Sequence, residues 1–129
     1  MSSSFWIGSL LLSSLLVSGP VAAAKSQNIG GLVLEEVAPR IATPNGDLFN
    51  DKIFFKFRQS DSLLGIPVES AIYDINGAKI SDLEVDPSDD SRLTWDARDD
   101  SGNFVPSGIY VYSIKIGKNF ATGTVVVAR

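Results

Sequence analysis

The amino-acid sequence predicts an all-β fold, and three observations support that prediction. Apolar and polar residues alternate over several short stretches of the chain. Clusters of Gly, Pro, Asn and Asp separate these stretches, and none of the stretches is separated from the next by a helical pattern. Alternation with a period of two and closely spaced turns are typical of a small antiparallel β-sandwich.

Residues 1–24 are predicted to be a secretory signal peptide. The segment carries no ionisable side chain, and its apolar stretch, residues 5–17, is interrupted only by Gly and Ser. A helix-breaking Gly-Pro pair follows, and then a run of alanines that ends at Ala24. A short apolar core before small residues favours cleavage after Ala24, with Ala23 as the second choice. Because no Lys or Arg precedes Phe5, an uncleaved anchor is the alternative.

The first half of the mature chain is predicted to contain two strands. Residues 25–31 are polar, end in Gly, and are expected to form a short leader before the domain at 32–129. Residues 32–37 form the first predicted strand. Two prolines and an Asn-Gly-Asp turn make 39–52 a structured loop. Residues 53–57 place apolar side chains on one face and a lysine on the other, which indicates a half-buried strand.

The second half is predicted to contribute five more strands. Asn76-Gly77 is a hairpin signal, because both residue types tolerate positive φ. The predicted strands of this half are residues 68–75, 79–85, 92–96, 110–116 and 120–128. Seven strands within about 100 residues predict a seven-stranded antiparallel immunoglobulin-like (fibronectin III-like) β-sandwich.

Composition narrows the classes of function. The chain has 15 acidic and 11 basic residues, a net charge of −4, and no segment that concentrates Lys and Arg, so no nucleic-acid partner is expected. It contains no Cys, which excludes disulfides and lipid attachment at a cysteine. It also contains no His, the commonest general base and a frequent zinc ligand. These features favour a secreted domain held by its apolar core over an enzyme.

Four oxygen-bearing side chains lie within seven residues of the predicted loop at 39–52, and two interpretations are open. Calcium prefers carboxylate and amide oxygens, so the group is a candidate calcium site. Alternatively, the side chains accept hydrogen bonds from nearby backbone N–H groups. The spacing differs from that of an EF-hand, which favours the second interpretation and no cofactor. The four residues are Asn45, Asp47, Asn50 and Asp51.

A second acidic cluster is predicted to be structural and not catalytic. Glycoside hydrolases hold two carboxyl groups about 5–10 Å apart across a cleft, and a small sandwich with one acidic turn offers no obvious cleft. Asp96 is expected to end its strand by accepting backbone N–H bonds. Asp99 and Asp100 are expected to begin a turn that Gly102 completes.

The aromatic residues are expected to divide between core and surface. Strand alternation places Trp95, Tyr110 and Tyr112 in the apolar layer and not on a sugar-stacking surface. Tyr110 follows Gly108 as a tyrosine-corner residue does, so its hydroxyl is expected to bond nearby backbone. Three other large apolar residues lie out of phase with the buried face or in a loop, and we expect them to be exposed. These three are Phe54, Phe104 and Ile109.

Four short motifs follow one another in the second half: Tyr-Asp-x-x-Gly, Trp-Asp-Gly-x-Asp-x-x-Gly, Val-Pro-x-Gly-x-Tyr-x-Tyr, and a last strand of Gly-x-Val-x-Val that ends in a basic residue. The matching residues are Tyr73, Asp74, Gly77, Trp95, Asp96, Asp99, Gly102, Val105, Pro106, Gly108, Tyr110, Tyr112, Gly123, Val125, Val127 and Arg129. The pattern resembles the immunoglobulin-like domain of flagellar hook-capping (FlgD-type) proteins and the C-terminal sorting domains of type IX secretion and gliding-motility cargo. Ala97 stands where that family usually has glycine.

The first half adds a fifth motif. Residues 43–51 read Thr-Pro-Asn-Gly-Asp-Leu-Phe-Asn-Asp. This is similar to the Thr-Pro-Asn-Gly-Asp-Gly-x-Asn-Asp element of the gliding-associated version of the domain, with Leu48 in place of the second glycine. The five motifs together cover nearly the whole mature chain. The resemblance implies a β-sandwich that is recognised by secretion or surface-assembly machinery.

The sequence therefore predicts a non-enzymatic, exported immunoglobulin-like interaction module that acts in secretion, sorting or surface assembly at the bacterial cell envelope. Its expected partner is an envelope or secretion-machinery protein. Export through the general secretory route places it outside the cell, on the cell surface or in the periplasm, with no membrane span after signal cleavage. A calcium-dependent carbohydrate-binding or adhesion module is the alternative, which solvent-facing aromatic rings on one sheet would favour. Hydrolysis by the acidic turn is the third hypothesis.

Overall fold

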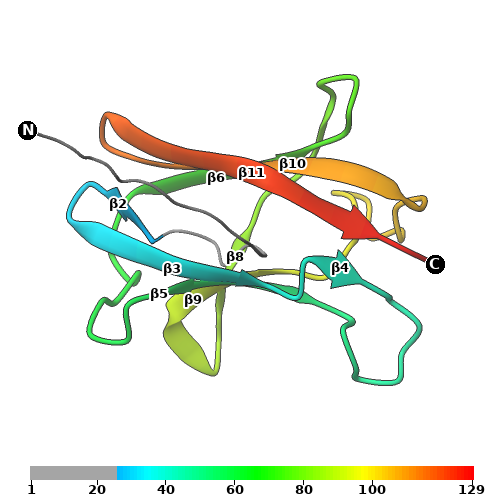
Figure 1. The fold of residues 1–129 in the computed structure, drawn as a ribbon, viewed down its shortest axis with the longest axis horizontal. Helices are drawn as coiled ribbons and strands as arrows, with labels where there is room; N and C mark the ends of the chain where they lie inside the picture. Colours follow the sequence, from blue (N-terminus) through cyan, green and yellow to red (C-terminus); the bar gives the residue numbers. More distant parts are fainter. Residues whose placement is uncertain (1–25) are drawn as a thin grey trace, which may run out of the picture.

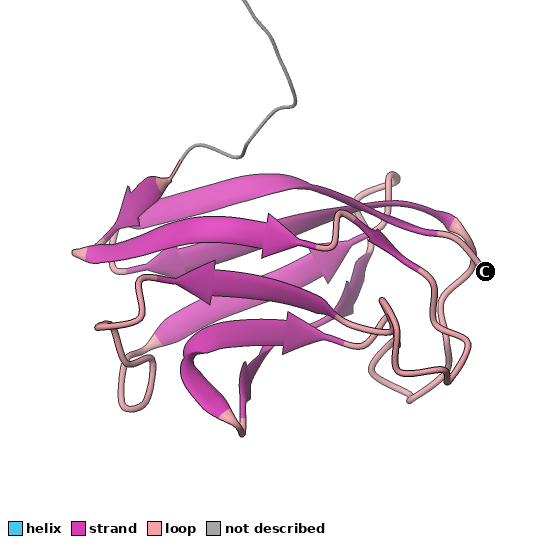
Figure 2. Ribbon diagram, turned by 60° about the horizontal axis from the view of Figure 1, so that its bottom comes forward, coloured by secondary structure: helices cyan, strands magenta, loops and turns pink. Residues whose placement is uncertain are grey.

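Two β-sheets pack face to face in the computed structural model, which describes residues 26–129 (Figure 1). Within those residues the regular secondary structure consists of β-strands alone, so the all-β prediction is confirmed. Figure 2 shows the strands of both layers running lengthwise, with the loops gathered mainly at the two ends of the sandwich. The predicted signal peptide, residues 1–24, lies outside the described residues.

Residues 26–129 contribute five strands to each sheet. The first sheet is antiparallel and has the order β2 (Gln27–Ile29), β3 (Leu32–Ala38), β5 (Ile53–Phe57), β9 (Asp89–Trp95) and β8 (Glu84–Asp86). The second sheet has the order β4 (Ile41–Ala42), β11 (Asn119–Val127), β10 (Gly108–Ile116), β6 (Val68–Tyr73) and β7 (Lys79–Ser81). Its strands are antiparallel except for β4, which pairs with β11 in parallel.

Alternating apolar side chains build the core between the sheets. In β5, Ile53, Phe55 and Phe57 are buried, as their spacing predicted. On β11, Val125 and Val127 are buried in the same way from the second sheet. Burial of these alternate positions supplies the main stabilisation of a domain without disulfides.

Aromatic pairs join the two sheets. Trp95 of β9 packs edge-on against Tyr110 of β10, with ring centroids 5.5 Å apart. Phe55 packs against Tyr112 in the same way at 4.9 Å. Trp95, Tyr110 and Tyr112 are each at most 5 % exposed, so their predicted place in the core is confirmed. The Tyr110 hydroxyl donates to the carbonyl of Pro106 at 2.6 Å, as the tyrosine-corner interpretation requires.

Two turns share one hydrogen-bond pattern. In each, the Oδ1 atom of an aspartate, Asp74 or Asp99, accepts the N–H groups two and four residues later, at 2.9–3.0 Å. The carbonyl of the same aspartate accepts the N–H of Gly77 or Gly102 at 3.0 Å. The φ angles of Gly77 and Gly102 are 88° and 86°, in the left-handed region. These motif residues therefore form turns, and the predicted hairpin at Gly77 is present.

Within residues 26–129 the sandwich has ten strands, not the predicted seven. The predicted strand at 79–85 is divided into β7 in the second sheet and β8 in the first. The chain crosses between the sheets at Asp82 and Leu83, where the Ser70 hydroxyl accepts from the Leu83 N–H at 3.1 Å and donates to the Leu83 carbonyl at 3.4 Å. The apolar pattern of residues 79–85 is continuous, so it gave no sign of this crossing, which the Ser70 side chain stabilises.

Two further strands are too short to produce a visible alternation. The predicted leader at 25–31 contains β2, and its Ile29 is fully buried in the core. The predicted loop at 39–52 contains β4, where Val126 N–H donates to the Arg40 carbonyl at 2.9 Å. Because β4 runs parallel to β11, the prediction of a wholly antiparallel sandwich is wrong at this pair.

Asp96 does not end β9 in the predicted way. Among the described residues its carboxylate accepts no backbone hydrogen bond, and it lies 3.7 Å from Arg98 Nε at the surface. The strand ends because Ala97 has a φ of 61°, which turns the chain away from the extended direction. The Trp95 indole then donates to the Arg98 carbonyl at 2.9 Å.

The two positions at which the chain departs from the motifs that it resembles share an unusual backbone conformation. Leu48 and Ala97 have φ angles of 66° and 61°, in the left-handed region that costs a residue with a side chain about 1–2 kcal/mol. Glycine at either position would adopt the same turn without that cost. Ala97 is fully buried, whereas the Leu48 side chain is 93 % exposed.

Replacing Leu48 by glycine is expected to raise the free energy of unfolding by about 1 kcal/mol, because it relieves the left-handed strain and loses no buried contact. Phe49→Gly is the matched control, since Phe49 is also exposed but has no positive φ. Glycine there is expected to lower stability slightly through the entropy of the unfolded chain. Urea unfolding of both variants measures the difference. A Leu48→Gly protein less stable than the parent would contradict the assigned conformation.

Candidate functional site

β11 has one edge that is covered over only part of its length. Within residues 26–129, the nine-residue strand pairs with β10 from end to end, but on its other side β4 pairs only with its last two residues. The N–H groups of Val126 and Ala128 donate toward β4, and successive residues in a strand direct their backbone groups to alternate sides. The backbone groups of Phe120, Thr122 and Thr124 therefore face the side on which no strand of residues 26–129 pairs with them, although β2 lies close to β11.

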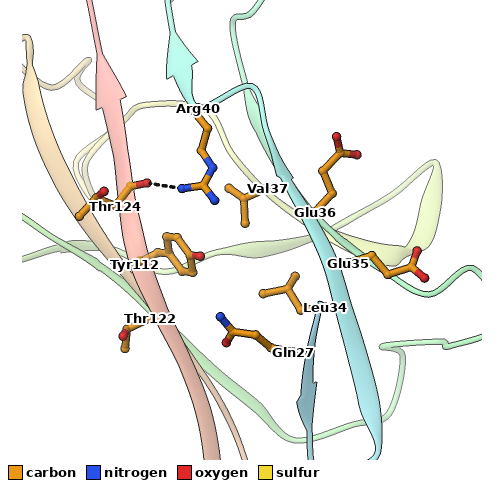
Figure 3. A pocket seen from close by; sticks show the side chains of 10 residues that line it. Gln27, Leu34, Glu35, Glu36, Val37, Arg40, Tyr112, Thr122 and Thr124 are labelled. Carbon is orange, nitrogen blue, oxygen red and sulfur yellow. Dashed lines mark hydrogen bonds between the residues drawn. The ribbon is translucent and has the colours of Figure 1, made fainter. Parts of the chain in front are cut away.

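A groove of about 410 Å³ lies beside this edge, between the two sheets (Figure 3). Leu34 and Val37 of β3 line one wall, and β11 with the Tyr112 ring lines the other. Near one end of the groove, the turn after β2 packs closely against β10, since a Cβ at Gly30 would lie 2.9 Å from Ile116. Two hairpins therefore meet at that end.

The charged side chains around the groove point in different directions. Figure 3 shows the Arg40 guanidinium and the Gln27 amide directed into the space between β3 and β11. The carboxylates of Glu35 and Glu36 point away from it, and Glu36 pairs with Lys56 at 3.4 Å. The interior of the groove therefore has a cationic character, although the whole chain is acidic.

Tyr112 belongs both to the core and to the groove. Its ring lies directly on β11 because position 123 is glycine, where a Cβ would be 2.5 Å from the Tyr112 hydroxyl oxygen. Burial raises the pKa of Tyr112, and the nearby Arg40 guanidinium opposes this by lowering the pKa. The hydroxyl is therefore a neutral donor at physiological pH, and it makes no hydrogen bond within residues 26–129.

Arg40 stands where the chain passes from β3 to β4. Its Nη1 atom donates to the Thr124 carbonyl at 3.3 Å, and no carboxylate of the described residues forms an ion pair with it. A guanidinium has five N–H donors, so several remain for a ligand. The groove thus combines an open strand edge, one cation, neutral hydrogen-bonding groups and an apolar wall.

The loop at 45–51 is braced by its own side chains. Asp51 accepts from the N–H groups of Asn45 and Leu48 at 3.1 and 2.8 Å, through its two carboxylate oxygens. Asn45 and Asp47 accept from the N–H groups two residues later, at 3.0 and 2.8 Å. These contacts are those of the capping interpretation. The loop presents Leu48 and Phe49 to solvent.

The candidate calcium ligands remain a prediction. Asn45, Asp47 and Asp51 lie in one loop and share its backbone contacts, whereas Asn50 has a φ of 55° and gives its carbonyl to Thr43 N–H at 2.8 Å. Within residues 26–129, no group of three or more His, Cys, Asp or Glu side chains has the geometry of a metal site.

The remaining sequence motifs form turns and core and lie outside the groove, with the exception of Tyr112 and Gly123. Asp99 holds a turn, and Asp100 donates its N–H to the Ile80 carbonyl at 3.0 Å. The predicted exposure of Phe104 and Ile109 is confirmed at 37 % and 52 %. The predicted exposure of Phe54 is wrong: its side chain is half buried, because the Arg92 guanidinium covers its ring at 4.3 Å.

Sequence reasoning did not find the groove. Its two walls come from β3 and β11, which lie in different sheets and are far apart in the chain. One signal was present: Thr122 and Thr124 alternate with small or apolar residues in the last strand, which indicates an outward face that is polar but uncharged. Arg40 beside Pro39 carried no recognisable pattern.

Comparison with known proteins gives a similarity of fold. No protein-family model matches the chain, and no curated protein matches it by sequence. Among solved structures, the chain is similar to part of PorZ, described as an essential bacterial surface component of the type IX secretion system of Porphyromonas gingivalis. The TM-score is 0.50 at 18 % identity, over 80 % of this chain and 16 % of PorZ. At 18 % sequence identity, the similarity shows a shared fold and nothing about function.

The structure also bears on membrane insertion. Within the described residues, no helix has the length and apolar character needed to cross a membrane.

Asp51→Ala is expected to lower the free energy of unfolding by about 1–2 kcal/mol, because two backbone N–H groups lose their acceptor. Asp47→Ala removes one such contact and is expected to cost less. The melting temperature of the parent protein is expected to be the same in calcium chloride and in chelator, since the loop braces itself. A melting temperature that falls steeply in chelator would support the calcium interpretation instead.

Proposed function

We propose that this chain is a non-enzymatic, exported protein-binding module of immunoglobulin-like architecture that acts in secretion, sorting or surface assembly at the bacterial cell envelope. The observation that supports this most strongly is the open edge of β11 beside the groove. Natural sheets usually shorten, charge or cover their edges, because an open edge pairs readily with another chain. A long, uncharged edge above a groove is suited to adding a strand from a partner.

The strand order supports the immunoglobulin-like part of the proposal. In the first sheet β3, β5, β9 and β8 correspond to strands A, B, E and D of that fold. In the second sheet β11, β10, β6 and β7 correspond to G, F, C and C′. Tyr110 near the start of β10 occupies the place of the tyrosine corner on strand F.

Three observations support the setting. Residues 1–24 have the pattern of a signal peptide for the general secretory route. The sequence motifs resemble domains of secretion and gliding-motility cargo. The fold resembles part of a surface component of a type IX secretion system. All three favour a protein partner in the envelope over nucleic acid or a membrane anchor.

The chemistry of the described side chains supports binding over catalysis. The carboxylates of Asp51, Asp74 and Asp99 accept backbone hydrogen bonds and hold turns. The rings of Trp95 and Tyr110 are buried in the core, so neither can form the sugar-stacking surface that a carbohydrate-binding module needs.

Immobilised protein is expected to recover a protein partner from the solubilised envelope of its own cells, and excess soluble protein is expected to compete for that partner. The same preparation is expected to turn over no glycan, peptide or ester. Heat-unfolded protein on the same support is the control for non-specific adsorption. Specific hydrolysis that Asp99→Asn abolishes, together with no recovered partner, would contradict the proposal.

A further inference from the structure

We infer that the groove binds an extended acidic segment of a partner protein, which adds as a strand to β11 and places a carboxylate against Arg40. This inference rests on the proposed protein-binding function and names the chemistry of the partner. It is carried by three features of the groove: the direction of the free backbone groups, the position of the single cation, and the shape of the walls.

The free backbone groups define how a strand would pair. Phe120, Thr122 and Thr124 direct their N–H groups to the open edge, together with the carbonyls of Phe120 and Thr122. The Thr124 carbonyl is already occupied by Arg40. The open length ends where β4 begins to pair at Val126. A partner strand of about five residues would therefore satisfy the remaining donors and acceptors.

The position of Arg40 selects the charge of the partner. Its guanidinium lies at the end of the open edge, fixed by its bond to Thr124 and directed into the groove (Figure 3). The other side chains that point inward are neutral, among them Gln27 and Tyr112. A guanidinium pairs best with a carboxylate, in a charge-assisted hydrogen bond. The whole chain, Arg40 included, has more acids than bases, 15 against 11, so the attraction is local to this groove.

The walls accommodate alternate side chains of an added strand. Successive residues of a strand point to opposite faces, so every second side chain would enter the groove and the others would face solvent. The space of about 410 Å³ is bounded by Leu34, Val37 and the Tyr112 ring. The inward residues are thus expected to be apolar, apart from the acidic residue at Arg40.

A second copy of the chain fits this site less well. Edge-to-edge pairing of two β11 strands would bring Asn119–Val127 of one copy alongside the same residues of the other. That segment contains no carboxylate, so Arg40 of each copy would face no acidic group on the added strand. Charge complementarity therefore favours a different, acidic partner.

The test uses two blocked peptides of alternating threonine and valine, one with a single glutamate and one with glutamine in its place. The glutamate peptide is expected to bind the parent protein at least about tenfold more tightly than the glutamine peptide, measured by calorimetry. Arg40→Gln is expected to remove this preference, and Arg40→Lys to restore part of it. Lys115→Gln, which removes a cation from the outer face of β10, is the matched control and is expected to change nothing.

A second pair of variants tests the backbone pairing. Thr122→Pro removes the N–H at the centre of the open edge and is expected to weaken both peptides about tenfold or more. Thr122→Val loses the same hydroxyl but keeps the N–H, and is expected to bind both peptides more tightly than Thr122→Pro does. Circular dichroism and melting confirm that each variant is folded. If the proline variant does not fold, the arginine series still decides the outcome.

The results that would overturn the inference are distinct from failure of the proposed function. Equal binding of both peptides, or binding unaffected by Arg40→Gln, rejects the acidic strand. Sedimentation that shows a dimer of the parent, broken by Thr122→Pro, assigns the edge to a second copy. An envelope partner recovered equally by parent, Arg40→Gln and Thr122→Pro leaves the protein-binding function standing and places it on another surface.

Discussion

The short attachment of the segment around Arg40 to β11 is the contact on which the candidate site depends. The Arg40 and Ala42 carbonyls accept the N–H groups of Val126 and Ala128, both at 2.9 Å, and the Arg40 side chain bonds the Thr124 carbonyl at 3.3 Å. These bonds attach the segment to the second sheet, at the point where the chain leaves the first. Because β4 ends after two residues, most of the β11 edge has no paired strand among residues 26–129. A longer β4 would have closed the sandwich and removed the groove.

Tyr112 couples this edge to the interior. Its ring packs edge-on with Phe55 across the sandwich and also lies directly on β11 at Gly123. The hydroxyl reaches the groove, so a ligand there would contact a residue whose position is set by core packing. Preorganisation of this kind lowers the entropy that binding must overcome. The groove is therefore better regarded as a rigid feature of the sandwich than as a flexible loop site.

The predictability of this structure follows the length and periodicity of its parts. β5, β10 and β11 are long enough for alternation to reveal both their existence and their buried faces. The turns at Asp74 and Asp99 were predictable because Asp and Gly each have a local reason to be there. β2 and β4 are stabilised by backbone pairing with distant strands, and two or three residues cannot display a pattern. The crossing at Leu83 depends on the hydroxyl of Ser70, a contact 13 residues away that no local rule anticipates. The groove could not be predicted from the sequence for the same reason, since its walls meet only after both sheets have formed.

Native-state hydrogen exchange measured by NMR tests residue by residue whether the edge of β11 is open. The N–H groups of Ala121, Gly123 and Val125 face β10 and are expected to be protected to near the global stability of the domain. Those of Phe120, Thr122 and Thr124 are expected to exchange orders of magnitude faster, and Val126, bonded to Arg40, to be protected again. Uniform protection along the whole strand would show that the edge is covered in solution, and would contradict the account.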